Sequence, residues 1–163
     1  MKLKIAVPAG LILLLVFAVP VFLSAQPASD GSIPAYRPGL GDLMTMTVQP
    51  RHIKVGLALQ EKNWPLAAYE LHELEESFER VARYWPQWRK KPIAEMMTSV
   101  TKDPMSVLEQ AIKTAETSKA SSAFEQLTEA CNTCHQSVEV GVIVIKIPES
   151  SSFPNQDFRP AKR

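Results

Sequence analysis

The stretch from Asp42 to Ala130 constrains the fold most, because Gly56 is its only glycine and its apolar residues follow helical spacing. Between Trp64 and Trp85 the apolar positions recur at alternating steps of four and three, which is typical of one face of a packed helix. These positions are Ala67, Leu71, Leu74, Phe78, Val81 and Trp85. The stretch contains no β-hairpin signal and no convincing internal repeat. The pattern predicts an all-α fold.

Prolines and capping residues divide this stretch into helices. The first is predicted from about Asp42 to Glu61, with a kink or a break at Pro50. The second begins at Trp64-Pro65, and the third begins at Asp103-Pro104, after a short helix over 93–100. The fourth runs over about 119–138, with an apolar seam at Ala120, Phe124, Leu127, Cys131, Cys134 and Val138. Since the length of 163 residues suits one domain, we expect an antiparallel four-helix bundle over 42–138.

The N-terminus is predicted to be a signal peptide over residues 1–25. Lys2 and Lys4 precede an apolar run over 5–23, and Ser24-Ala25 supplies small residues for cleavage. The alternative is an uncleaved membrane anchor, since the run is nearly long enough to span a bilayer. Prolines within the run favour cleavage. Either interpretation exports the working domain, and we expect a periplasmic protein without a membrane span after cleavage. An irregular, proline- and glycine-rich leader follows over 26–41.

The charge balance gives no electrostatic reason to expect nucleic-acid binding. The chain carries 18 basic and 17 acidic side chains, with a formal net charge of +1. Cleavage after Ala25 removes Lys2 and Lys4 and leaves 16 basic against 17 acidic groups. Apolar residues make up 45% of the chain, which excludes a largely disordered protein.

The pentapeptide Cys131-Asn132-Thr133-Cys134-His135 has the spacing for covalent attachment of a c-type haem. On a helix, the two cysteines lie one turn apart on one face, where their sulfurs can reach both vinyl groups of one porphyrin. His135 follows at once and can bind the iron from the proximal side. The sequence therefore predicts one covalent haem c, attached in the last helix.

Two other uses of paired cysteines fit less well. A thioredoxin-like dithiol needs a strand before the motif and a βαβ setting, and the sequence shows neither. A structural zinc site needs four ligands, and this chain has two cysteines and three histidines in all. Thioether bonds also account for both thiols of an exported protein, whose compartment would otherwise oxidise them.

A four-helix pattern with this motif in its last helix resembles the class II cytochromes c, over roughly residues 42–138. The class I arrangement does not apply, because no histidine or methionine follows His135. The resemblance implies a haem electron carrier that is not an enzyme and acts with a redox partner protein. It also allows a homodimer. Members often carry an arginine near the haem propionates in the first helix, and Arg51 is the matching residue.

His52 is the main candidate for a second iron ligand. It lies on the predicted stripe of Val48, Val55 and Leu59, and Gly56 is expected to leave room beside it for the porphyrin. Ligation would give a low-spin, bis-histidine haem. The alternative is a hydrogen-bonded histidine at the edge of the bundle. In that case Val55 would be the apolar distal residue, and a five-coordinate iron would bind a small gas such as nitric oxide or carbon monoxide.

The remaining histidine and the methionines carry less weight. Met44 and Met46 are further ligand candidates, and His72 is predicted to lie at the surface or at the boundary of the core. Met96, Met97 and Met105 are expected to fill the core. Peroxidatic turnover is disfavoured, because Arg51-His52 is the only histidine–arginine pairing that suits it.

The tail over 139–163 departs from the class II pattern, whose members usually end soon after the motif. Its β-branched run over 142–145 is predicted to pack on the bundle as an extended segment. The remaining proline- and serine-rich part is expected to be poorly ordered.

Overall fold

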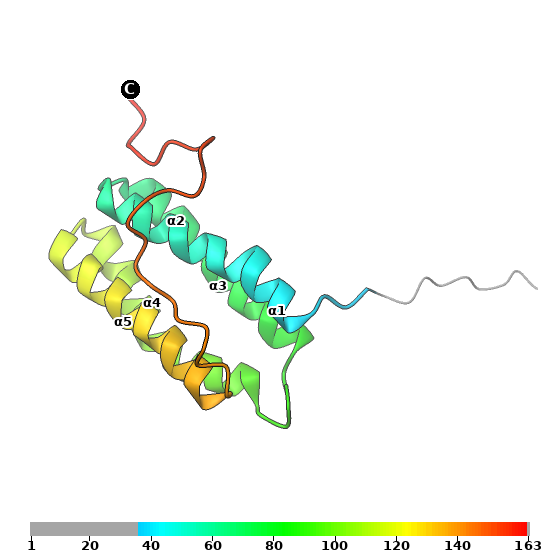
Figure 1. Ribbon diagram of the computed structural model, residues 1–163. Coiled ribbons are helices and arrows are strands. Elements are labelled where there is room, and N and C mark those ends of the chain that lie inside the picture. The colour runs from blue at the N-terminus through cyan, green and yellow to red at the C-terminus, as the bar shows by residue number, and fades with distance from the viewer. Residues whose placement is uncertain (1–35, 163) are drawn as a thin grey trace, which may run out of the picture. The chain divides into compact units, whose positions relative to one another are not determined.

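The computed structural model describes residues 36–162, and these form an all-helical domain in which no β-strand occurs (Figure 1). Its elements are α1 (Leu40–Leu43), a π-helical turn η1 (Met44–Val48), α2 (Gln49–Gln60), α3 (Trp64–Tyr84), α4 (Ile93–Lys113) and α5 (Thr117–Ser137). Because α1, η1 and α2 are continuous, the domain has four helical rods, an arrangement compatible with a four-helix bundle. The predicted signal peptide over 1–25 and most of the predicted leader lie outside the described residues.

The first rod contains the irregularity that was expected at Pro50. A regular α-helix would bring the proline ring against the carbonyl four residues earlier, and proline has no N–H to donate. The chain responds one turn before the proline, where the Gln49 N–H bonds to the carbonyl of Met44, five residues back. This wider π-helical turn lets the rod continue through Pro50. The proline therefore neither ends nor divides the helix.

The second and fourth rods follow the sequence pattern closely. The Asn63 side chain caps α3 by accepting a hydrogen bond of 3.4 Å from the Leu66 N–H, and Pro65 occupies the first turn. The predicted apolar stripe is buried from Ala67 to Val81, and its last residue, Trp85, is half-buried at the C-cap of α3. In α5 the predicted seam residues Ala120, Phe124 and Leu127 are buried.

The prediction of two separate helices over 93–113 is wrong. Helix α4 is continuous, with Pro104 inside it. An interior proline costs about 3 kcal/mol in a helix, but one buried stripe runs along both sides of Pro104. It comprises Ile93, Met97, Thr101, Leu108, Ala111 and Ile112. Burial of this stripe against the neighbouring helices outweighs the missing hydrogen bond.

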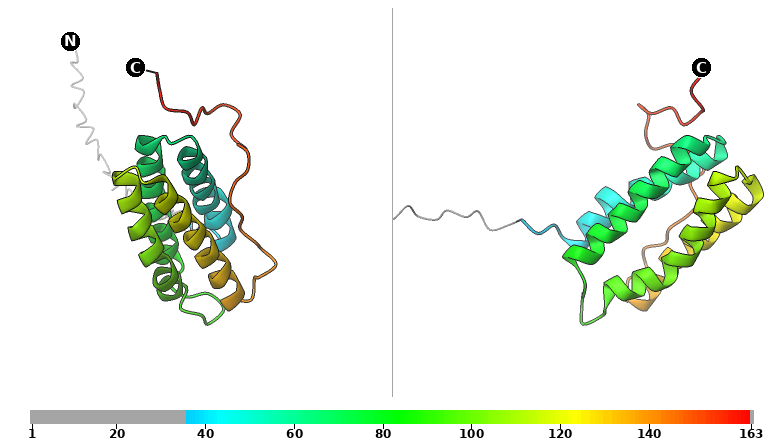
Figure 2. Two further views of the ribbon diagram at one scale, coloured as in Figure 1. Left: turned by 90° about the vertical axis from the view of Figure 1, so that its left-hand side faces the viewer. Right: turned by 180° about the vertical axis from the view of Figure 1, so that it is seen from behind.

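Packing between the rods makes one apolar core. Helix α4 lies along α5, and α2 lies along α3 (Figures 1 and 2). The side chains of Leu74, Leu108 and Leu127 are completely buried at the centre. Within the described residues, no helix is both long and apolar enough to cross a membrane.

The C-terminal segment, residues 139–162, runs along the domain beside α5 and α2 (Figure 1). Gln60 Nε2 donates to the Pro148 carbonyl at 2.6 Å, and Asn63 Nδ2 donates to the carbonyls of Phe158 and Arg159 at 3.0 and 3.1 Å. The Phe158 side chain is buried. The expectation of a poorly ordered tail is therefore wrong, because α2 and the α2–α3 turn bind it by side-chain hydrogen bonds.

Gly56 lies where the C-terminal segment passes close to α2. A Cβ at position 56 would lie 2.6 Å from Cγ of Pro148 and 2.8 Å from Cε1 of Phe124. Neither distance is sterically allowed. The room that Gly56 leaves is taken by Pro148 and Phe124, which corrects the expectation that a porphyrin would occupy it.

Candidate functional site

Cys131, Cys134 and His135, in the last turns of α5, line one cavity of about 310 Å³. This volume is at the lower end of the range for cofactor sites. The first rod, the start of α4 and the C-terminal segment supply the other walls, which are mostly apolar. Examples from these walls are Leu40, Val48, Ile93, Val100, Val140 and Ile145. The fold thus places both thiols and the imidazole of the motif at one apolar site.

Both cysteines are free thiols in partly buried positions. Burial, with a smaller contribution from the neighbouring Cys134, raises the pKa of Cys131 to about 12, and burial also raises the pKa of Cys134. A redox-active dithiol needs the opposite shift, because the thiolate is the reactive form. This environment therefore disfavours the thioredoxin-like interpretation.

The His135 ring is oriented by the C-terminal segment. Its Nδ1 lies 2.8 Å from the carbonyl oxygen of Ile143. A carbonyl can only accept, so Nδ1 carries the proton and donates it. Nε2 is then the nitrogen with a free lone pair. Histidines that bind metals through Nε2 have this arrangement, in which the other ring nitrogen donates to a carbonyl or a carboxylate.

Asn132, the second residue of the motif, holds the segment that supplies this carbonyl. Its Oδ1 accepts from the Ile145 N–H at 2.8 Å, and its Nδ2 donates to the Ile145 carbonyl at 3.1 Å. The pair closes a ring of two hydrogen bonds two residues beyond Ile143. Sequence reasoning placed 142–145 against the bundle and gave Asn132 no role. The polar residue between the cysteines was the available signal.

His52 lies on α2, is buried, and lines the same cavity. Its Nε2 lies 2.9 Å from the hydroxyl of Thr128, and its ring stacks on Phe124 with centroids 4.7 Å apart. The Thr128 hydroxyl donates to the Phe124 carbonyl at 2.9 Å, so the His52 ring donates through Nε2. Burial lowers the pKa of His52 to about 4, which keeps the ring neutral at physiological pH. Sequence reasoning found His52 but missed Thr128 and Phe124.

Met44 also lines the cavity, at the first residue of the π-helical turn. Met46, two residues later, is 75% exposed and is not among the lining residues. Turns of π-helix are frequently found at functional sites. Of the two methionines considered as ligands, only Met44 is placed to reach the interior of the cavity. Met97, expected as core, contributes to another wall.

Arg51 is not brought to the cavity. Its guanidinium donates to Glu70 at 2.8 Å and pairs with Glu73 at 3.0 Å, both on α3. The hydrogen bond that Arg51 donates to Glu70 raises the pKa of Arg51. Since Glu70 is buried, Arg51 and Lys54, at 3.8 Å, compensate a carboxylate inside the protein. The geometry thus gives Arg51 a structural role, and Arg51 does not line the cavity.

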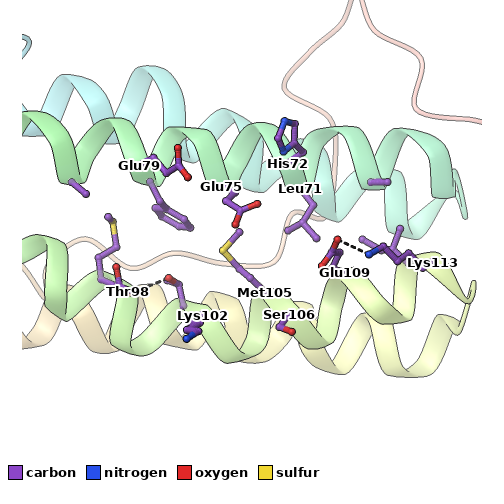
Figure 3. A pocket seen from close by; sticks show the side chains of 16 residues that line it. Leu71, His72, Glu75, Glu79, Thr98, Lys102, Met105, Ser106, Glu109 and Lys113 are labelled. Atoms are coloured by element: carbon purple, nitrogen blue, oxygen red, sulfur yellow. Dashed lines mark hydrogen bonds and ion pairs between the residues drawn. The ribbon is translucent and has the colours of Figure 1, made fainter.

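His72 lies on α3 at the rim of a groove between α3 and α4, and its ring points away from α4 (Figure 3). As predicted, it is at the surface, and its Nε2 is 3.5 Å from Glu76. Figure 3 shows the groove's polar rim, including the ion pair of 2.7 Å between Glu109 and Lys113. Within residues 36–162, no group of three or more histidine, cysteine or acidic side chains could hold a metal ion without a porphyrin.

The residues present fit a covalently bound haem in two respects. Two thiols one helical turn apart and an imidazole with a free Nε2 face one cavity, and the other walls are apolar, as a porphyrin requires. Comparisons with protein-family models, curated protein sequences and solved structures find no match for this chain.

Proposed function

We propose that this protein is an exported monohaem c-type cytochrome of the class II type, which transfers single electrons between redox partner proteins. The proposed fold is an antiparallel four-helix bundle with the haem motif in its last helix. Cys131 and Cys134 form the thioether bonds, and His135 is the proximal ligand. The remaining site residues are proposed to shape the cavity and to carry out no catalysis.

The hydrogen bond from His135 Nδ1 to the Ile143 carbonyl is the observation that carries this proposal. Sequence spacing alone predicts a haem, but it does not predict which ring nitrogen is free. With Nδ1 donating, Nε2 is the nitrogen available to the iron, and the ring is held in one orientation. Both cysteine thiols line the same cavity as this ring. The arrangement supports haem attachment better than a dithiol or a zinc site.

Haem c, when bound, supplies a one-electron couple at its iron. The residues of this chain determine its surroundings. Apolar walls from the first rod and α4 exclude water, which disfavours the charged ferric state relative to the ferrous one. His135 is only partly covered and Ile143 is 53% exposed. A haem edge at this end of α5 would lie near the surface, where a redox partner protein can approach it.

Gas binding is the second candidate function, and His52 favours it. The Nε2 of His52 is engaged by Thr128, so ligation through that atom requires this buried hydrogen bond to break. If His52 keeps this bond and Met44 does not bind a haem, the mostly apolar cavity would offer room for a small uncharged ligand. Nitric oxide or carbon monoxide could then bind there.

Visible and EPR spectra of the ferric protein test the choice between these functions. We expect a low-spin iron that reduces reversibly and does not bind carbon monoxide. Loss of the low-spin signal in His52→Ala identifies His52 as the sixth ligand, and loss in Met44→Ala identifies Met44. Met46→Ala is the matched control, since its exposed side chain does not line the cavity. A high-spin spectrum that neither variant changes, with binding of carbon monoxide, would contradict electron transfer and favour gas binding.

A further inference from the structure

The haem motif of this chain contains a residue that links it to the C-terminal segment. Asn132 is on α5 between the two cysteines, and its side-chain amide makes two hydrogen bonds to the backbone of Ile145. Ile143, two residues earlier in the same segment, accepts the hydrogen bond from His135 Nδ1. The Asn132 amide and the His135 imidazole therefore bind one extended segment at two points, Ile145 and Ile143.

We infer that Asn132 is a positioning residue for the proximal histidine, and that it acts by holding the Ile143 carbonyl against His135 Nδ1. The inference rests on the proposed haem attachment. A carbonyl that accepts from a metal-bound imidazole raises the basicity of that ligand. A more basic ligand stabilises ferric iron and lowers the reduction potential. Asn132 would thus affect the potential without touching the iron.

The surrounding contacts explain why Asn132 is needed for this. Near Ile143 the segment is exposed, and little apolar burial fixes it: Val142 is 95% exposed and Val144 is 63% exposed. The next anchor is Pro148, which packs on Gly56 and accepts a hydrogen bond from Gln60. Without the Asn132 amide, the exposed stretch beyond Ile143 would lose its attachment to α5. Ile143 would then be held by the His135 bond and by the turn in which its N–H donates to the Val140 carbonyl at 2.9 Å. The His135 bond would then exchange with water.

The reduction potential of the haem-loaded protein tests the inference, with Asn132→Ala as the variant. We expect its potential to rise above that of the wild type. Asn63→Ala is the matched control: Asn63 also anchors the C-terminal segment, but at Phe158 and Arg159. Its potential should equal that of the wild type.

An Asn132→Ala potential equal to that of the wild type, or an equal rise in Asn63→Ala, would overturn the inference. If Asn132→Ala does not fold, hydrogen exchange of the Ile145 amide in the wild type decides: slow exchange supports the inference and unprotected exchange contradicts it. Nitrogen NMR shifts of the His135 ring separate this inference from the proposed function. If the chain attaches no haem but the His135 ring carries its proton on Nδ1, only the proposed haem attachment is refuted. A loaded chain without the Nδ1–H signature would refute only the positioning role.

Discussion

Two histidines line one cavity, one from α2 and one from α5, and they are held by different ring nitrogens. On the α2 side, His52 donates through Nε2 to Thr128 and stacks on Phe124, deep in the core. On the α5 side, His135 donates through Nδ1 to a backbone carbonyl near the surface. The bond that each ring makes determines which nitrogen is left for a metal. Only the His135 side leaves Nε2 free, in a ring adjacent to the cysteines.

Removal of the aromatic ring beneath His52 should have the largest effect on stability. Phe124 is 3% exposed and contacts both His52 and the space at Gly56. Phe124→Ala should lower the free energy of unfolding by about 3–5 kcal/mol, measured by urea denaturation. Phe153→Ala, which removes a half-buried ring from the C-terminal segment, is the comparison variant. Equal losses in both would show that the His52 side is no better packed than the surface.

The pH dependence of stability should come from the His52 side. The His52 pKa is about 4 in the folded chain, against an ordinary value of 6.5, because burial disfavours the charged ring. The unfolded chain therefore binds a proton that the folded chain excludes. The contribution to stability is complete above about pH 6.5, falls as the pH drops to about 4, and amounts to about 3 kcal/mol.

Urea denaturation of the wild type and of His52→Gln at several pH values measures the contribution of His52 to the free energy of unfolding. The difference in free energy of unfolding between the two proteins should shrink on going from pH 7 to pH 4. A constant difference across this range would mean that the His52 ring is not buried in its neutral form.

The close approach of the C-terminal segment to α2 should have a smaller effect. In Gly56→Ala the new Cβ would clash with Pro148 and Phe124, so the segment or the ring must move. We expect a loss of about 1–3 kcal/mol, with faster proteolysis of the chain after Val140. Gly41→Ala is the control, because a Cβ there meets no atom within 4 Å. If Gly56→Ala were as stable as Gly41→Ala, the segment would not pack on α2.

Loss of the Thr128 hydroxyl should have an effect of about the same size as Gly56→Ala. Thr128→Val keeps the shape of the side chain and leaves the His52 N–H without its partner, at a cost of about 1–3 kcal/mol. Thr101→Val provides a comparison, because the buried Thr101 hydroxyl bonds only to the Met97 carbonyl of its own helix. We expect Thr128→Val to lose more stability in thermal or urea unfolding.

The helices could be predicted because their evidence is local. The stripe of α3 and the seam of α5 repeat within single segments, and the seam directs both cysteines to the interior. Pro104 shows the limit of such evidence. Its local preference for a helix start was outweighed by a stripe that is buried on both sides of it by neighbouring helices. Burial by neighbouring helices cannot be deduced from the residues adjacent to a proline.

The motif residues of the candidate site could be predicted from the sequence, but their hydrogen-bond partners could not. The spacing of Cys131, Cys134 and His135 is a local motif, and the fold brings these residues to one cavity. The partner of His135 is eight residues further on, in a segment without regular structure, so no periodicity indicates it. Arg51 was assigned by resemblance alone. Two carboxylates on α3, Glu70 and Glu73, bind it instead.

Covalent attachment of haem is the central claim, and the intact mass of the purified protein tests it most directly. The protein should be produced in cells that carry a c-type cytochrome maturation system. Its mass should exceed that of the processed chain by one haem, which acidified acetone should not extract. The Cys131→Ala, Cys134→Ala double variant should have the mass of the polypeptide alone. A wild-type chain without bound haem, or a double variant that retains it covalently, would contradict the account.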